Sequence, residues 1–175
     1  MRYRRAVIPG GTFFFTLVTA GRRPLLASAE AVDILRRAFI AVRSARRFTV
    51  DAIVVLPDHL HCIWTLPPGD ADFATRWRLV KTWFTKHYDP VRQMPADDAR
   101  VSGKIWQHRY WEHALRDETD FTRHVEYIHF NPVKHGLVKS ACAWQYSSFH
   151  RYVEAGLYPE EWGCDAQDMD GIGHE

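Results

Sequence analysis

Hydrophobic residues along the chain follow two spacings, one typical of strands and one typical of helices. Runs rich in β-branched and aromatic residues predict strands over Thr12–Val18, Phe48–Leu56 and His59–Leu66. The first run follows Gly10-Gly11, and Pro57-Asp58 makes a tight break between the second and the third. These two features indicate that the second and third strands form a hairpin.

Other segments carry apolar residues three or four positions apart. They predict helices over Ser28–Arg43, with Ser28 as N-cap, over Phe73–Tyr88 and over Thr119–Phe130. The third helix is expected to end at Asn131-Pro132, because the residue before a proline disfavours the α region. The remaining segments predict a polar loop over Asp89–Gly103, one or two short strands over Lys104–Arg116, and a further turn of helix within Ala141–Tyr152.

The order of these elements predicts an α+β fold. Strand, helix, strand, strand, helix, strand is typical of a ferredoxin-like sandwich, in which helices cover one face of an antiparallel sheet. Here an extra helix follows toward the C-terminus. We expect one domain over residues 1–153 and an acidic C-terminal tail over residues 154–175.

The composition excludes several classes of protein. The chain has 175 residues, of which 46% are hydrophobic, so it can bury a substantial core. No apolar run approaches the length of a transmembrane helix, and we expect no contact with a membrane. Three widely spaced cysteines argue against a disulfide framework or a four-cysteine zinc site. They favour free thiols in a reducing cytoplasm.

Charge is distributed unevenly along the chain. Residues 1–50 hold ten arginines and two acidic residues, whereas residues 154–175 hold seven acidic residues and no Lys or Arg. A basic end favours a polyanionic partner such as nucleic acid, although arginines also solvate exposed helices and loops. The acidic tail either folds over a basic DNA groove and inhibits it or remains a solvated extension.

The sequence His59-Leu60-His61 is the first candidate for chemistry. Residues two apart on a strand point to the same side, so both imidazoles can hold one metal ion while Leu60 points into the opposite layer. A polar surface pair is the alternative for such a motif taken alone.

Tyr127 and Asn131 form the second candidate. They are four positions apart on the third predicted helix and therefore share a face, with His124 one turn before Tyr127. Tyr127 lies beside the apolar stripe, so we expect a packed ring and a solvated phenol. The alternative is a boundary residue whose hydroxyl merely reaches water.

Basic and aromatic residues form the third candidate, because cations follow phosphates and aromatic rings stack on unpaired bases. The candidate DNA contacts are Arg4, Arg5, Arg22, Arg23, Lys81, Lys86, Trp106 and Arg109. Both Trp106 and Trp111 can instead be core residues at strand ends, and for Trp111 we favour the core.

Together these groups suit one reaction. A divalent metal polarises a scissile phosphate, and a tyrosine attacks it as a covalent nucleophile. Imidazole and amide ligands with open positions suit Mg²⁺ or Mn²⁺.

Two longer stretches contain these residues and resemble a known family. The run from Val54 to Trp64, VVLPDHLHCIW, resembles the HUH metal motif of small bacterial single-strand transposases. The run from Tyr127 to Val138, YIHFNPVKHGLV, resembles the nucleophile helix of that group and its exit. With further matches near the N-terminus, at Trp106-Gln107 and over Trp144–Phe149, the chain is most similar to the REP-associated tyrosine transposases.

The resemblance implies specific roles. His59 and His61 would be metal ligands, and Asn131 would stand where the wider superfamily often has a glutamine ligand. Tyr127 would form a 5′-phosphotyrosine with single-stranded or hairpin DNA from repetitive extragenic palindromes (REP). The resemblance also implies a nucleoid-associated monomer, although related insertion-sequence enzymes are domain-swapped dimers.

Two other functions remain open at the level of sequence. A non-catalytic nucleic-acid-binding module with a ferredoxin-like sheet would need aromatic residues on an open sheet face. A metal-dependent hydrolase that uses water would need an acidic general base near the metal, and Asp58 or Glu112 are candidates.

Overall fold

A four-stranded antiparallel sheet forms the centre of the computed structural model, which describes residues 7–88 and 104–163. The strands are β1 (Thr12–Val18), β2 (Thr49–Val55), β3 (His59–Thr65) and β4 (Trp111–Ala114), in the order β2-β3-β1-β4. This is the strand order of a ferredoxin-like sandwich, and the predicted fold class is confirmed.

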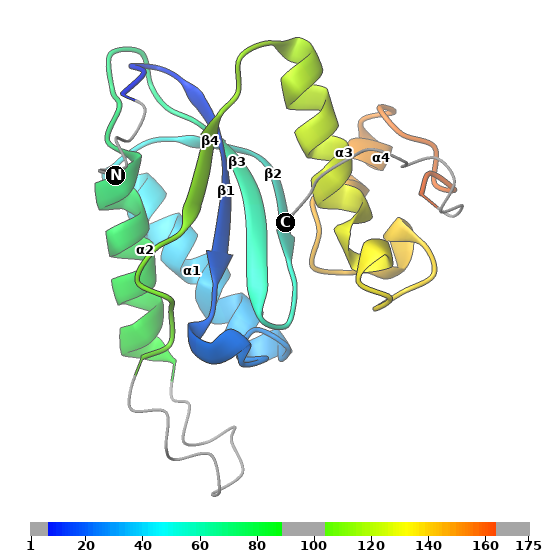
Figure 1. Cartoon of the computed structure of the whole chain (residues 1–175), viewed down its shortest axis with the longest axis horizontal. Helices are drawn as coiled ribbons and strands as arrows, with labels where there is room; N and C mark the ends of the chain where they lie inside the picture. The colour runs from blue at the N-terminus through cyan, green and yellow to red at the C-terminus, as the bar shows by residue number, and fades with distance from the viewer. Residues whose placement is uncertain (1–6, 89–103, 164–175) are drawn as a thin grey trace, which may run out of the picture.

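Helices lie on both sides of the sheet (Figure 1). α1 (Ala29–Ala45) and α2 (Phe73–His87) cover one face, whereas α3 (Glu118–Lys134) crosses the other and has α4 (Phe149–Glu154) beside it. Two short 3-10 turns span Ala20–Arg22 and Ala141–Ala143. The sheet is therefore buried on both sides, with the extra C-terminal helix on the face opposite to the ferredoxin-like pair.

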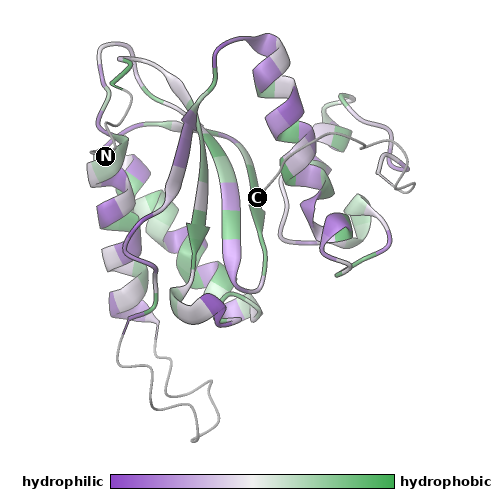
Figure 2. Ribbon diagram, viewed as in Figure 1, coloured by the Kyte–Doolittle hydropathy of each residue, from purple (hydrophilic) through white to green (hydrophobic). Residues whose placement is uncertain are grey.

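Alternation along β1 divides the core into two parts. Phe13, Phe15 and Leu17 pack against α1 and α2, whereas Phe14 packs against α3. In β3 the first six of seven residues are buried, as expected for a central strand covered on both faces. Figure 2 shows hydrophobic residues concentrated in the central strands, while hydrophilic bands recur along the helices.

Side-chain caps fix the start of the helices. The Ser28 side chain accepts a hydrogen bond of 3.1 Å from the Ala31 amide, so the predicted N-cap of the first helix is confirmed. Asp72 caps α2 through the Thr75 amide, and Asp117 caps α3 through the Asp120 amide. Each cap supplies an acceptor to an amide that has no partner within its helix.

The predicted end of the third helix is wrong. α3 continues through Pro132 to Lys134, and the amides of His135 and Leu137 close its last turn on the carbonyls of Asn131 and Pro132. Gly136 then adopts a φ of 67°, which ends the helix at little steric cost. Pro132 has no N–H and so removes one intrahelical hydrogen bond, but its buried ring packs within the domain. Asn131 is therefore a helical residue and not a terminal one.

The remaining predicted segments have different outcomes. Lys104–Arg116 contributes one strand, β4, and an isolated bridge between Trp106 and Thr19. Residues 164–175, most of the acidic tail, lie outside the described residues, as does the loop over residues 89–103. Up to Gly163 the tail packs on the domain, because Trp162 stacks on Phe149 of α4 at 5.8 Å between ring centroids. The boundary at residue 153 and the inhibitory tail stay predictions.

Candidate active site

Two histidines open strand β3 on the face covered by α3. Leu60 between them belongs to the α1–α2 core, as predicted from the alternation along the strand. The ring centroids of His59 and His61 are 4.9 Å apart, and the two residues are 2% and 1% exposed. This burial excludes the polar surface pair considered above.

Each imidazole is held through its Nδ1 atom. The Nδ1 of His59 lies 2.6 Å from Oδ1 of Asp58, and the Nδ1 of His61 lies 2.8 Å from Oγ1 of Thr16. When Nδ1 donates its proton to these oxygens, the lone pair is on Nε2, the arrangement typical of metal-binding histidines. The local contacts thus fix the orientation of both imidazoles.

Asp58 is an ionised acceptor in this arrangement. Partial burial raises its pKa, but the hydrogen bonds from His59 and Arg22 and the positive charge of Arg22 outweigh this effect and lower the pKa below its usual value. Arg22 contributes an ion pair of 3.3 Å to Oδ2 of Asp58. Asp58 therefore links a basic side chain at the surface to the first histidine of the pair.

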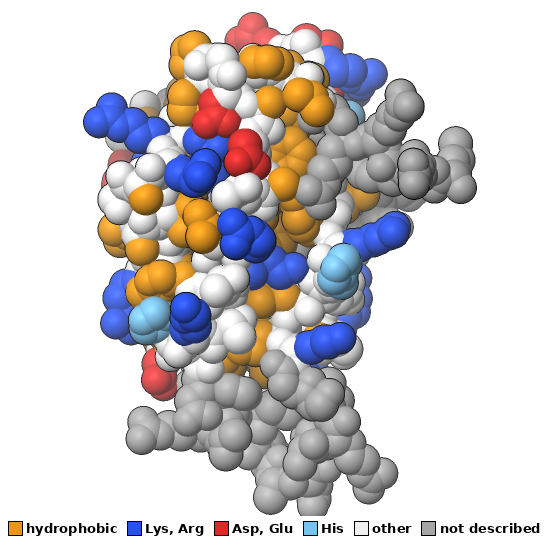
Figure 3. Space-filling model, turned by 90° about the vertical axis from the view of Figure 1, so that its left-hand side faces the viewer, with side chains coloured by type: hydrophobic (Ala, Val, Ile, Leu, Met, Phe, Trp, Pro, Cys, Tyr) orange, Lys and Arg blue, Asp and Glu red, His pale blue; other side chains and the backbone are white. Residues whose placement is uncertain are grey.

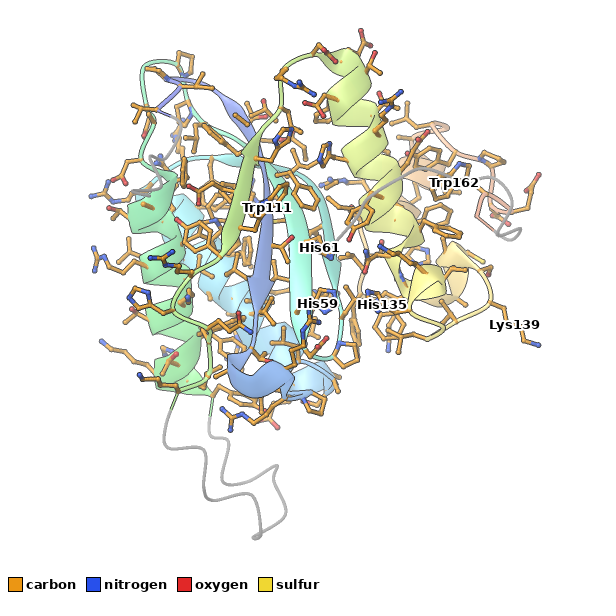
Figure 4. All side chains as sticks on the ribbon, viewed as in Figure 1. His59, His61, Trp111, His135, Lys139 and Trp162 are labelled. Atoms are coloured by element: carbon orange, nitrogen blue, oxygen red, sulfur yellow. The ribbon has the colours of Figure 1, made fainter. Side chains whose placement is uncertain are left out.

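One face of α3 lies against the two histidines. The ring of Tyr127 is 5.2 Å from that of His61, and the ring of His135 is 5.1 Å from that of His59 (centroid distances). Figure 4 shows His135 opposite His59, between β3 and the end of α3. Asn131 lies midway between Tyr127 and His135 on this face, because the three residues are spaced by four.

The amide of Asn131 is buried without hydrogen bonds. Asn131 is 0% exposed, and neither its Oδ1 nor its Nδ2 atom has a hydrogen-bond partner among the described residues. An unsatisfied buried amide costs roughly 1–3 kcal/mol unless a ligand uses it. A metal ion that takes the amide oxygen together with two imidazoles agrees with the chemistry of this set of donors.

The packed ring expected at Tyr127 is confirmed, and the solvated phenol stays a prediction. Tyr127 is 8% exposed, and its ring packs with Phe14, at 5.9 Å between centroids, in the core between the sheet and α3. Nζ of Lys134 lies 4.9 Å from the centroid of the same ring. The buried face of α3 is broader than the apolar stripe suggests, because the helix contacts the sheet on one side and the α4 region on another.

Comparison with known proteins assigns this arrangement to a family. A REP-associated tyrosine transposase from Escherichia coli (strain K12) is 48% identical over 167 residues, which cover 95% of this chain and 93% of the relative. The chain belongs to the REP-associated tyrosine transposases. A solved structure of a REP-associated tyrosine transposase bound to a REP hairpin has 45% sequence identity and a TM-score of 0.81, and the match covers 100% of this chain and 98% of that one.

The predicted family and enzyme class are thereby confirmed: the protein is a transposase. No family model matches the chain. Within residues 7–88 and 104–163, no helix of this REP-associated tyrosine transposase has the length and hydrophobicity required to cross a membrane.

A second group of polar residues in the transposase joins β4 to the start of α3. The carboxylate of Asp120 accepts hydrogen bonds from Nε2 of His113 and from the backbone and side chain of Arg116, and it lies 3.2 Å from Nδ1 of His124. The ligand atoms of His113, Asp120 and His124 lie within 4.8 Å of one another, as in a metal site. Hydrogen bonds from Arg116 and His113 already occupy the carboxylate of Asp120. We therefore interpret these three residues as a structural link that holds the start of α3 against β4.

The basic residues predicted to contact DNA lie in different places on the transposase. Arg22 reaches the histidine site through Asp58, whereas Arg23 bonds to the carbonyls of Ala20 and Lys104. Lys81 donates to the carbonyl of Gln107 at 2.7 Å. Lys81 and the exposed Lys86 belong to α2, on the far side of the sheet from His59. Figure 3 shows Lys and Arg side chains spread over the α2 face.

Three further predictions concern Arg109, Arg4 and Arg5. Arg109 is exposed just before β4, on the segment that leads to the edge of the sheet. Arg4 and Arg5 lie outside the described residues. The basic candidates among the described residues therefore do not form one cluster around the histidines, and of these Arg22 reaches the site, through Asp58.

The two tryptophans have the opposite exposure to the one that we predicted: Trp106 is buried and Trp111 is exposed. Trp106 is 8% exposed and packs on Phe84 at 5.2 Å between ring centroids, so its ring is not available to stack on a base. Trp111, for which we favoured the core, is 53% exposed. The difference arises because β4 is an edge strand that begins at Trp111, whereas Trp106 precedes it and lies beneath α2.

Sequence reasoning missed two residues of the site. The helical spacing of four from Asn131 indicates His135, but a helix that ends at Asn131 does not extend to it. Thr16 has no signal in the sequence, because its contact with His61 depends on the register between β1 and β3.

Proposed function

We propose that this transposase cleaves and rejoins single-stranded or hairpin DNA of the REP type, with Tyr127 as the nucleophile. The observation that carries the proposal is the contact of Tyr127 with His61, 5.2 Å between ring centroids, inside a buried site that also holds His59 and Asn131. The proposed nucleophile thus lies beside the proposed metal ligands.

His59, His61 and Asn131 are proposed to hold a divalent cation, Mg²⁺ or Mn²⁺. The support is the orientation of both imidazoles through Nδ1 and the buried amide of Asn131, which has no other partner among the described residues. When bound, such a cation polarises the scissile phosphate and neutralises charge on its oxygens. Three protein ligands leave positions open for phosphate and water.

Tyr127 performs the covalent step in this proposal. Its phenolic oxygen forms a bond to the scissile phosphorus while the bond from phosphorus to the 3′ oxygen breaks. The phenol loses its proton, the departing 3′ oxygen gains one, and a 5′-phosphotyrosine remains. Nζ of Lys134 lies 4.9 Å from the centroid of the ring, and its positive charge would favour loss of the phenolic proton. Attack by a 3′ hydroxyl on the phosphotyrosine reverses the step and rejoins the strand.

Hairpin DNA is the proposed partner. The support is the REP hairpin bound by the transposase that is 45% identical to this chain. Arg22, Lys86 and Arg109 are exposed cations that can follow a phosphate backbone. Action as a monomer and association with the nucleoid stay predictions.

The arrangement of the sheet argues against both alternative functions. Asp58 already bonds His59 and Arg22, and Glu112 pairs with Phe15 and thus lies on the α1–α2 side of the sheet. Neither carboxylate is placed as a general base for a metal-bound water. A binding module that uses an open sheet is disfavoured because helices cover both faces.

A cleavage assay tests the proposal. Labelled REP hairpin DNA is incubated with Mn²⁺ and one of three proteins: the wild type, Tyr127→Phe or His61→Ala. Cleavage and binding are measured separately for each protein. We expect both variants to lose cleavage, and Tyr127→Phe to keep wild-type affinity because its ring remains packed. An active Tyr127→Phe variant would instead indicate a hydrolase that uses water.

A further inference from the structure

One exposed aromatic side chain has no role in the chemistry described above. Trp111 is 53% exposed, and every other Phe, Tyr or Trp side chain in residues 7–88 and 104–163 is buried or half-buried. An isolated exposed tryptophan would need no explanation. Trp111 is of interest because of its position in the sheet relative to His59 and His61.

Trp111 lies in the same row across the sheet as His61. Thr16 pairs with His61 on one side and with Trp111 on the other, and residues paired across strands share a face. Two strand spacings separate Trp111 from His61, which corresponds to about 10 Å. Figure 4 shows both residues on the sheet beside α3. The exposed ring is thus within a few nucleotides of any phosphate bound at the histidines.

Stacked rings hold the indole in place. It is nearly parallel to the ring of His113, at 11° and 5.7 Å between centroids, and His113 stacks in turn on His124 at 5.1 Å. The edge contact with Phe14, at 5.5 Å and 71°, supports the indole from the core side. A fixed ring loses little conformational entropy when it binds a flat partner, so this ladder preorganises Trp111.

We propose that Trp111 stacks on an unpaired nucleobase next to the scissile phosphate. This inference rests on the proposed function, because it takes the histidine site as the place where DNA is cut. A base placed on the indole extends the ladder of Trp111, His113 and His124 by one ring. Base stacking on an aromatic ring tolerates any sequence, and the exposed Arg109 nearby along the chain can contact the adjoining phosphate. Trp111 would therefore position the single strand and leave base identity to other contacts.

Binding measurements with abasic DNA test this inference. The probe is a fluorescently labelled REP hairpin with a single-stranded extension on either side, in which one extension nucleotide at a time is abasic. Affinities are measured in a Tyr127→Phe background, so that no cleavage occurs. We expect Trp111→Ala to weaken binding roughly ten- to one-hundred-fold. One abasic position should weaken binding by a similar factor with Trp111 present, but have little effect in Trp111→Ala.

Matched variants separate stacking from folding. Trp111→Leu keeps an apolar contact with Phe14 but lacks a flat ring, and should bind as weakly as Trp111→Ala. Trp111→Phe should keep most of the affinity. Ile40→Ala, an exposed apolar site on α1, should bind as wild type does.

Two results would overturn the inference. One is unchanged affinity in both Trp111→Ala and Trp111→Leu, or an abasic effect that is equal with and without Trp111. Either outcome would show that Trp111 does not stack on a base, and it would leave the proposed function intact. Failure of protein with Trp111 intact to bind any hairpin would remove both.

Discussion

The ring of Tyr127 lies 5.2 Å from that of His61, at an angle of 70° between the ring planes. Sixty-six positions separate these residues along the chain, and the packing of α3 on β3 brings them together. Both rings also contact Phe14, at 5.9 Å and 5.5 Å between centroids. An aromatic core therefore holds the proposed nucleophile beside a candidate metal ligand without DNA.

The contact between Thr16 and His61 should tune the affinity for metal. Thr16→Val removes the oxygen at 2.8 Å from Nδ1 of His61 while keeping the shape of the side chain. Loss of a partner behind a ligating histidine typically weakens metal affinity 10- to 100-fold. We expect a loss of that size for Mn²⁺, measured by calorimetric titration.

Thr12→Val is the matched control for this substitution. Thr12 is on the same strand, but its hydroxyl bonds to Thr65 at 2.9 Å, far from the histidines. Its affinity for Mn²⁺ should equal that of the wild type. Equal affinities in all three proteins would mean that Thr16 does not orient a ligand.

The buried amide of Asn131 should lower the stability of the metal-free protein and strengthen the binding of metal. Asn131→Leu replaces a buried amide that has no hydrogen-bond partner among the described residues with an apolar group of similar size. In EDTA, urea unfolding should show a free energy of unfolding higher by about 1 kcal/mol. The stabilisation that Mn²⁺ gives the wild type should shrink in this variant.

Asn131→Gln separates the two effects of that substitution. It keeps an amide oxygen and should keep stabilisation by Mn²⁺. If Asn131→Leu retains the full stabilisation by Mn²⁺, Asn131 is not a ligand.

His129 should make the fold sensitive to acid. Burial, together with the positive charges of Arg151 and His150, lowers the pKa of His129 to about 3, and its Nε2 lies 2.9 Å from Oγ of Ser148. Between about pH 6.5 and 3 the unfolded chain binds a proton that the folded protein does not, so stability falls as the pH falls through this range. The contribution approaches about 1.4 kcal/mol per pH unit.

Urea unfolding at several pH values measures this dependence. His129→Leu should show a shallower loss of stability than the wild type between pH 6.5 and 3. A His108→Gln variant, changed at an exposed histidine, should follow the wild type. Parallel curves for wild type and His129→Leu would show that His129 does not titrate as described.

Local periodicity was sufficient to predict much of the fold and part of the site. The shared face of His59 and His61 follows from strand geometry alone, and the opposite direction of Leu60 follows with it. The spacing of Tyr127 and Asn131 likewise places both on one helix face. These predictions hold because they depend only on neighbours along the chain.

Tertiary packing decided what the sequence did not predict. The burial of Tyr127 depends on the packing of α3 against β1 and β3, and the exposure of Trp111 depends on β4 lying at the edge of the sheet. Pro132 within α3 shows that a local preference against helix yields when the residue is buried near a helix end. The link from Thr16 to His61 required the register between strands.

The most direct test of the central claim is to trap and map a covalent intermediate. Wild-type protein is incubated with REP hairpin DNA and Mn²⁺, digested and analysed by mass spectrometry, with Tyr127→Phe in parallel. We expect a nucleotide adduct on the peptide that contains Tyr127, and no adduct in Tyr127→Phe. Cleaved DNA without any protein adduct, or an adduct that persists in Tyr127→Phe, would contradict it.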